Sequence, residues 1–118
     1  MSRILIVDDD RNTTRMLRTI LEMDGFAVAT VERGEQVIPT AQDFRPDIIL
    51  LDYYLADMVG TDLVHILRAH PGRLATVPVI ITSGRDVEDE VLAAGANAFL
   101  VKPFEPGDLP DLFKRLID

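Results

Sequence analysis

Short apolar runs alternate along this chain with longer segments that have helical spacing. Four of the runs are rich in β-branched residues, which is typical of strands buried on both faces of a parallel sheet. These runs are residues 4–7, 48–51, 77–81 and 98–101. A fifth run, residues 26–30, alternates only weakly and follows a glycine, which predicts a strand nearer the sheet edge.

The segments between these runs favour helices. Residues 11–23 carry one apolar stripe, and residues 59–69 and 108–117 repeat the pattern. Pro39 lies inside the second helical segment, where we expect it to kink the helix or end it early. Residues 86–94 are few for a helix, so the fourth helix is expected to be short.

This alternation of strands and helices favours a parallel sheet with helices on both of its faces. We predict an α/β protein, a flavodoxin-like doubly wound (βα)5 sandwich whose five parallel strands follow the order 2-1-3-4-5. A length of 118 residues allows one buried core. Residues 1–118 are therefore expected to form one domain.

Acidic side chains outnumber basic ones, twenty to twelve, and the net charge of -8 repels nucleic acid and anionic membranes. We expect no direct nucleic-acid partner and no membrane partner. The absence of cysteine excludes disulfides and thiolate metal sites, and it fits a reducing compartment. No apolar run approaches the length of a membrane span, and no signal-peptide pattern precedes the first strand, so we expect a cytoplasmic protein.

Polar side chains follow four of the predicted strands directly. Asp8 and Asp9 come after the first strand and Asp52 after the third, while Ser83 and Lys102 follow the fourth and fifth. In a doubly wound sheet, ligands bind beyond the carboxyl ends of the strands. We therefore expect these five side chains to converge on one edge of the sheet.

Crowded carboxylates repel one another, which raises their affinity for protons or demands a cation, and a set of oxygen ligands without His or Cys suits Mg²⁺. A carboxylate can also attack phosphorus, provided that cations offset the charge of the phosphoryl oxygens. Lys102 and Ser83 can supply that stabilisation. Pro103 follows Lys102, and an X-Pro bond can adopt the cis form, which would aim the Lys102 side chain back at the site.

Simpler structural explanations exist for each of these residues. The acidic run from Asp8 to Asp10 can serve only to start a helix, because carboxylates there favour the helix dipole. Ser83 can be an ordinary loop hydroxyl, and Lys102 an ordinary surface cation. The matching positions of Asp8, Asp52 and Lys102 at strand ends favour a functional site. The two histidines, at positions 65 and 70, are assigned to neither metal nor phosphate.

Four segments, taken together, resemble the receiver domain of two-component response regulators over essentially the whole chain. They are ILIVDDD at residues 4–10, PDIILLD at 46–52, PVIITSG at 78–84 and AGANAFLVKPF at 94–104. No single segment is specific, but the four in this order and at these intervals are.

The resemblance implies a role for each site residue. Asp52 would accept a phosphoryl group from a phosphohistidine on a histidine kinase or phosphotransfer protein. Asp9, Asp52 and the backbone carbonyl of Tyr54 would bind Mg²⁺, with Asp8 acting mostly through metal-bound water. Ser83 and Lys102 would hold the phosphoryl oxygens.

The resemblance also implies a switch and an output. Ser83 and Phe99 would be the switch pair, which reshapes a surface for a downstream protein or an attached output domain. Tyr54 and Arg85 would tune the lifetime of the phosphoryl group. Such a protein is not an enzyme for a separate small substrate. The sequence leaves homodimer formation open.

The chain departs from the family in the spacing of Ser83 and Lys102, which are nineteen positions apart, about one helical turn fewer than expected. The shortened fourth helix that this implies favours one alternative, a receiver that docks constitutively without a phospho-switch. A second alternative is an aspartyl-phosphate phosphatase of the haloacid-dehalogenase type. It fits less well, because Asn12 stands where that family has Thr or Val.

Overall fold

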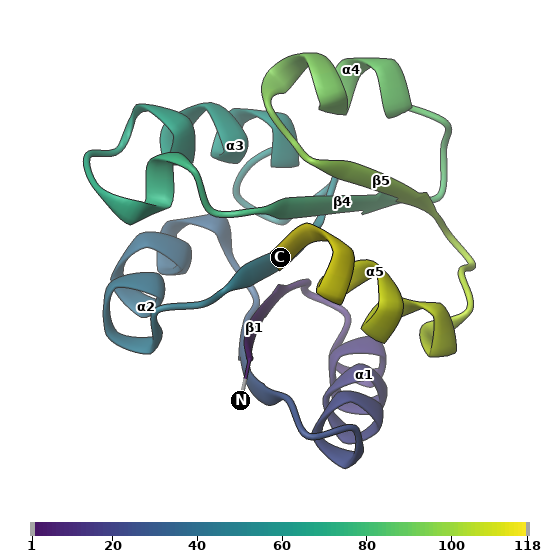
Figure 1. Ribbon diagram of the computed structural model, residues 1–118. Helices are drawn as coiled ribbons and strands as arrows, with labels where there is room; N and C mark the ends of the chain where they lie inside the picture. The colour runs from purple at the N-terminus through teal and green to yellow at the C-terminus, as the bar shows by residue number, and fades with distance from the viewer. Residues whose placement is uncertain (1, 118) are drawn as a thin grey trace.

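The computed structural model describes residues 2–117, so Met1 and Asp118, the two ends of the predicted domain, lie outside the described residues. Five parallel strands form one sheet with the order β2-β1-β3-β4-β5, as predicted (Figure 1). The strands are β1 (Arg3–Val7), β2 (Ala27–Val31), β3 (Ile48–Asp52), β4 (Val79–Ser83) and β5 (Ala98–Val101).

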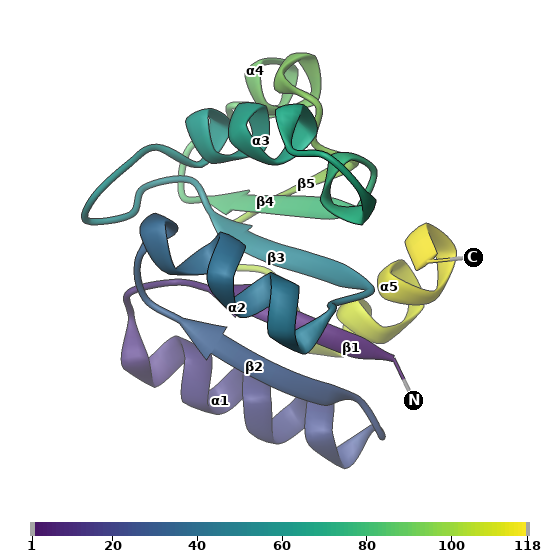
Figure 2. The same cartoon turned by 90° about the vertical axis from the view of Figure 1, so that its left-hand side faces the viewer.

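Among residues 2–117, five α-helices and three short 3-10 helices connect the strands or follow the last of them. The α-helices are α1 (Arg11–Met23), α2 (Val37–Phe44), α3 (Gly60–Ala69), α4 (Glu88–Ala94) and α5 (Leu109–Ile117). The 3-10 helices are η1 (Gly34–Gln36), η2 (Arg73–Ala75) and η3 (Pro106–Asp108). Figure 2 shows α3 and α4 on one side of the sheet and α1 on the other. Among residues 2–117, no helix is both long enough and apolar enough to cross a membrane.

Strand alternation divides the core into two clusters. Leu5 and Val7 of β1 pack in the cluster under α2, α3 and α4. Ile4 and Ile6 point to the other face and pack in the cluster under α1 and α5, which contains Phe113. All four of these β1 residues are almost fully buried, as the continuous apolar run predicts for a strand covered on both faces.

The strand boundaries differ from the predicted ones at β4. The apolar run begins at Val77, but β4 begins at Val79. Pro78 has no N–H to donate to a neighbouring strand, and only its carbonyl pairs, accepting from Ile49 N–H at 2.9 Å. The proline therefore delays the start of the strand by two residues.

The expectation that Pro39 ends the second helix early is wrong. Helix α2 runs through Pro39 to Phe44, because Pro39 is its third residue. The N–H groups of the first helical turn have no partner within the helix, so a proline there removes no hydrogen bond. The expectation of a short fourth helix is confirmed, since α4 has seven residues and ends at Gly95 with a φ of 112°.

A close turn follows the end of β3. The Gly60 N–H donates to the Tyr53 carbonyl at 2.6 Å, and Tyr54 and Val59 form an antiparallel bridge across the loop. A Cβ atom on Gly60 would lie 3.0 Å from the Asp52 carbonyl oxygen and 3.2 Å from Tyr53 Cα. Only glycine lets α3 begin this close to the strand end that carries Asp52.

We predict that Gly60→Ala destabilises the protein by about 1–3 kcal/mol, because the added methyl group overpacks against backbone that cannot rotate away. Urea unfolding measures the change. Gly84→Ala is the matched control, since a Cβ on Gly84 would meet no atom within 4 Å. Equal unfolding midpoints for the two variants would contradict the packing argument.

Candidate functional site

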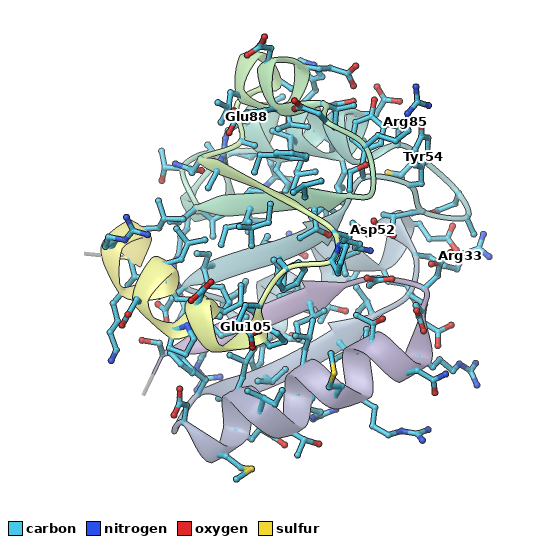
Figure 3. The ribbon with its side chains drawn as sticks, turned by 90° about the vertical axis from the view of Figure 1, so that its right-hand side faces the viewer. Arg33, Asp52, Tyr54, Arg85, Glu88 and Glu105 are labelled. Carbon is cyan, nitrogen blue, oxygen red and sulfur yellow. The ribbon has the colours of Figure 1, made fainter. Side chains whose placement is uncertain are left out.

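The residues selected from the sequence lie at the carboxyl ends of the strands. Asp52 is the last residue of β3 and pairs with Thr82 of β4, so the ends of these strands are level. The Lys102 N–H, just beyond β5, donates to the Ser83 carbonyl at 2.7 Å. Figure 3 shows Asp52 at this edge, with Tyr54 and Arg85 nearby.

Asp8, Asp9 and Asp52 form one acidic cluster. One carboxylate oxygen from each lies within 4.8 Å of the others. Their exposure differs, because Asp8 is only 5% exposed, Asp52 is half-buried and Asp9 is open to solvent. The cluster therefore has a buried floor and one accessible side.

The acidic run has two separate roles. Asp10 caps α1, where its carboxylate accepts from the N–H groups of Asn12 and Thr13. A hydrogen bond from the Thr13 hydroxyl, together with these backbone N–H groups, holds the pKa of Asp10 below its usual value. The helix-start explanation thus applies to Asp10, while Asp8 and Asp9 belong to the cluster.

Lys102 lies between two of the three carboxylates. Its Nζ is 3.3 Å from Asp8 Oδ2 and 3.2 Å from Asp52 Oδ1. Partial burial lowers the pKa of Lys102, but the negative charges of Asp8 and Asp52 outweigh that effect and raise the pKa above its usual value. The ammonium group therefore stays charged and offsets part of the acidic cluster. The peptide bond from Lys102 to Pro103 is cis.

The surroundings of Asp52 disfavour its ionised form. Its burial, and then the charge of Asp8, raise the pKa of Asp52 above 3.8, and Lys102 offsets this only in part. A carboxylate that is costly to ionise gains from any further cation. The donors of the cluster are all carboxylate oxygens, which are hard ligands, so the residues fit Mg²⁺. The acidic pocket is consistent with a magnesium site.

Ser83 does not join this cluster directly. It is 2% exposed, and its Oγ accepts from the Arg85 N–H at 3.1 Å. Along β4, Ser83 follows Val79 and Ile81, which pack on the α2–α4 face of the sheet. Among residues 2–117, no hydrogen bond joins its hydroxyl to Asp52 or Lys102. Ser83 therefore points to the α2–α4 face of the sheet, whereas Asp52 follows Ile48 and Leu50 on the face covered by α1 and α5.

The remaining predicted residues lie around the site rather than in it. Phe99 is half-buried on β5 and packs against the α2–α4 core cluster. Tyr54 is 54% exposed, and its ring stacks edge-on against the Tyr53 ring with centroids 4.7 Å apart. The Arg85 side chain is exposed. The structure thus brings Asp8, Asp9, Asp52 and Lys102 together and places the others beside them.

Sequence reasoning missed a contact between the end of β3 and α4. The Tyr53 hydroxyl donates to a carboxylate oxygen of Glu90. That hydrogen bond, together with burial, raises the pKa of Tyr53 to about 12. Tyr53 stands directly after Asp52, so the strand end is tied to the short helix. No spacing rule pairs residues thirty-seven positions apart, and the sequence gives no signal for this contact.

A second missed contact joins two loops at this edge. Asp57 accepts from the N–H groups of Gly34 at 2.8 Å and Glu35 at 3.0 Å. Burial opposes ionisation, but these two backbone donors prevail and lower the pKa of Asp57. Met58 fills the space above Gly34, where a Cβ would lie 2.4 Å from its sulfur. The loop after Asp52 is therefore anchored to the start of η1.

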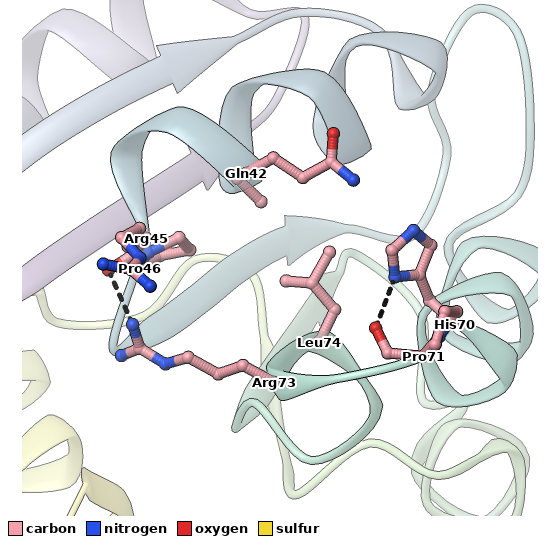
Figure 4. Close-up of a pocket in the computed structure, with 8 residues that line it drawn as sticks. Gln42, Arg45, Pro46, His70, Pro71, Arg73 and Leu74 are labelled. Carbon is pink, nitrogen blue, oxygen red and sulfur yellow. Dashed lines mark hydrogen bonds between the residues drawn. The ribbon is translucent and has the colours of Figure 1, made fainter.

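A separate hollow lies at the other end of the sheet. It has a volume of about 170 Å³ and is lined by residues from the end of α2 and the segment after α3 (Figure 4). Arg73 spans its side, donating to the Arg45 carbonyl and pairing with Asp47 at 2.9 Å. This hollow is not part of the acidic site, because it adjoins the amino ends of the strands.

The model of the response regulator receiver domain matches residues 4–114. The chain therefore belongs to the response regulator receiver family, and it is the receiver of a two-component phosphorelay. This family is not a conventional enzyme family, which sets aside the haloacid-dehalogenase alternative.

Curated relatives are regulatory proteins about twice as long. The DNA-binding response regulator MtrA of Mycobacterium tuberculosis is 39% identical over 110 residues, covering 91% of this chain and 46% of that protein. The transcriptional regulatory protein PrrA of the same species is 39% identical over 118 residues, covering 98% and 49%. The chain spans about half the length of these relatives.

Solved structures agree with the fold. The chemotaxis response regulator CheY4 of Vibrio cholerae is 28% identical with a TM-score of 0.89, covering 98% of each chain. The receiver domain of sensor histidine kinase PA1611 from Pseudomonas aeruginosa is 29% identical with a TM-score of 0.87, covering 98% of this chain and 97% of that one. That receiver holds a magnesium ion in its active-site cleft.

The raised pKa of Asp52 predicts a pH-dependent stability. The folded protein takes up the Asp52 proton at a higher pH than the unfolded chain, whose carboxyl titrates near 3.8. The ionised carboxylate therefore costs stability as the pH rises above that value. Without divalent ions, Asp52→Asn should unfold at a higher temperature than the wild type at about pH 7.

The difference in Tm between the two proteins should shrink as the pH falls toward and then below 3.8, because the carboxyl then becomes protonated in the unfolded chain too. Thermal unfolding followed by circular dichroism across this range measures it. Asp43→Asn, which removes an exposed carboxylate from α2, is the control for losing one negative charge. A wild type that is the more stable protein at about pH 7 would contradict the prediction.

Proposed function

We propose that this receiver accepts a phosphoryl group on Asp52 from a phosphohistidine of a histidine kinase or phosphotransfer protein. The observation that carries the proposal is the position of the Asp52 carboxylate, half-buried beside two other carboxylates and 3.2 Å from the Lys102 ammonium. A carboxylate in such a place attacks phosphorus, provided that positive charge faces the incoming oxygens. Residues 1–118 act as one receiver domain.

The transfer forms a bond between an Asp52 oxygen and phosphorus and breaks the bond between phosphorus and the histidine nitrogen. That nitrogen leaves with the electron pair and takes up a proton. Water later attacks the same phosphorus, which releases phosphate and restores the carboxylate. In both steps Lys102 faces the charged phosphoryl oxygens, and its raised pKa keeps it protonated.

Asp8, Asp9, Asp52 and the backbone carbonyl of Tyr54 would hold Mg²⁺ at this edge. When bound, Mg²⁺ neutralises charge on the phosphoryl oxygens. The residues themselves position the nucleophile, because Asp8 is fixed by the Asp10 N–H at 2.9 Å and Lys102 draws Asp8 and Asp52 together. The magnesium in the PA1611 receiver supports this assignment.

Ser83 and Phe99 form the switch pair in this proposal. The Ser83 hydroxyl exchanges its hydrogen bond with the Arg85 N–H for one with a phosphoryl oxygen, and the segment from Ser83 to α4 moves with it. Phe99, only half-buried on the adjacent strand, follows this movement. The surface around α4 and β5 changes shape, and a downstream protein or an attached output domain responds.

The DNA-binding function named for the longer relative MtrA is consistent with an attached output domain, which leaves this receiver without a direct nucleic-acid contact. A phosphorelay of this kind operates in the cytoplasm. Constitutive docking, the alternative, would use the same fold without the reaction. The two functions differ in whether Asp52 is modified.

We expect one added phosphoryl group when the protein is incubated with acetyl phosphate and Mg²⁺, and none for Asp52→Asn, which lacks the nucleophile. Intact mass spectrometry measures the adduct. Asp43→Asn is the matched control, since it removes an exposed carboxylate from α2 and should be modified like the wild type. A wild type that binds Mg²⁺ but gains no mass would favour the docking module.

Tyr54 and Arg85 tune the lifetime of the phosphoryl group in this proposal. The exposed Tyr54 ring stands two residues after Asp52, where its bulk hinders approaching water. We predict that Tyr54→Ala speeds dephosphorylation severalfold, or about 1 kcal/mol in the barrier. Decay of the adduct mass after removal of acetyl phosphate measures the rate. An unchanged rate would remove Tyr54 from the mechanism.

A further inference from the structure

The hollow at the amino ends of the strands takes no part in the reaction proposed at the acidic site. One wall comes from the end of α2, with Arg45 and Pro46, and the facing wall from the segment after α3, with His70 and Pro71. Figure 4 shows the two walls on opposite sides of the hollow, with Leu74 between them. The volume of about 170 Å³ is that of about six water molecules in the liquid, so a small molecule has room there.

The lining of the hollow combines an apolar floor with a few polar side chains. Leu74 is only 7% exposed, and the two prolines extend its apolar surface. The polar groups are the guanidinium groups of Arg45 and Arg73, the Gln42 amide and the His70 ring. Among the residues that the structure describes, neither Asp nor Glu lines the hollow. An apolar surface with few polar groups is the usual lining of a small-molecule site.

Arg45 has an unusual backbone conformation for its residue type. It ends α2 with a φ of 55°, in the left-handed region that glycine and asparagine adopt more readily than arginine. Its N–H donates to the Ala41 carbonyl at 2.8 Å, and its own carbonyl accepts from Arg73. Glycine could form both of these backbone hydrogen bonds. The backbone therefore gives no reason for an arginine at this position.

The charge of Arg45 is not neutralised within the fold. Among residues 2–117, its guanidinium forms no ion pair, whereas Arg73 pairs with Asp47 at 2.9 Å. Arg3 donates to the last carbonyl of α2 at 3.1 Å and brings a further positive charge. Asp43, on α2, is exposed and lies outside the lining. Three arginines and two carboxylates leave this region positive, in a chain with a net charge of -8.

We propose that the hollow binds a small organic anion, a carboxylate on a short apolar chain. The carboxylate pairs with the Arg45 guanidinium, whose planar set of N–H groups matches two oxygens at once. The Gln42 amide donates to the same group, and the apolar chain packs on Leu74 and the prolines. The floor favours such a ligand over inorganic phosphate, which has no apolar surface to bury. Phosphorylation of Asp52 is not required for this binding.

The test titrates the isotope-labelled protein with sodium butyrate, without divalent ions and at constant ionic strength, and follows the amide signals by NMR. We expect saturable shifts for residues 42–46 and 70–74, which border the hollow. Butyramide has nearly the same shape without the charge and should bind about tenfold more weakly, because it loses the charged hydrogen bonds to Arg45. Inorganic phosphate should also bind more weakly than butyrate.

Arg45→Asn removes the guanidinium and supplies a residue that tolerates the left-handed conformation. We expect it to bind butyrate about tenfold more weakly than the wild type. Arg15→Gln, which removes an exposed arginine from α1, is the control for losing one positive charge and should stay within about twofold. Gln42→Glu adds a negative charge at an exposed position of the lining and should also weaken binding, so the test survives if Arg45→Asn fails to fold.

Three results would each overturn the proposal: no saturable shift in the wild type, equal affinities for butyrate and butyramide, or unchanged affinity in both variants of the lining. Shifts confined to Asp8, Asp52 and Lys102 would also overturn it, because they would place the anion at the acidic site. The phosphoryl adduct on Asp52 is measured separately by mass. The reaction and the binding of an anion can therefore fail independently.

Discussion

The Lys102 ammonium holds together two carboxylates that would otherwise repel each other at the sheet edge. Its contacts with Asp8 and Asp52 join the ends of β1 and β3 to the segment after β5, across the centre of the molecule. The cluster keeps a net negative charge, because three carboxylates face one ammonium. The site therefore attracts cations by itself, and the rest of the fold serves to keep these strand ends level.

The sequence was sufficient for the architecture, because buried parallel strands leave continuous apolar runs and their connecting helices leave apolar stripes. It was insufficient where the effect of a residue depends on its exact position in a helix or strand. Pro39 was expected to kink α2 or end it early, yet α2 runs on to Phe44, because Pro39 lies in the first turn, where a proline costs no hydrogen bond. Pro78 delayed the start of β4 for the related reason that it cannot donate to a neighbouring strand.

The candidate site, like the fold, could be predicted from the sequence only in part. The acidic cluster and Lys102 could be predicted, because a rule about strand ends in doubly wound sheets places them together. The Tyr53–Glu90 hydrogen bond and the anchoring of Asp57 on Gly34 and Glu35 could not, since both depend on how loops from distant parts of the chain meet. These contacts hold the loops that border the acidic cluster, and only the three-dimensional structure shows them.

Neighbouring residues of an extended chain point to opposite faces of a sheet. Asp52, the last residue of β3, and Tyr53, directly after it, are such a pair. Asp52 faces the acidic pocket, with Ile6 and Leu50 in its lining, while Tyr53 packs in the cluster under α3 and α4 and reaches Glu90. The peptide bond between Asp52 and Tyr53 thus connects the acidic pocket on one face of the sheet to the α3–α4 side on the other. The acidic pocket and the α3–α4 side of the sheet can then diverge independently, because a substitution at Glu90 changes the contact made by Tyr53 without changing a residue of the pocket.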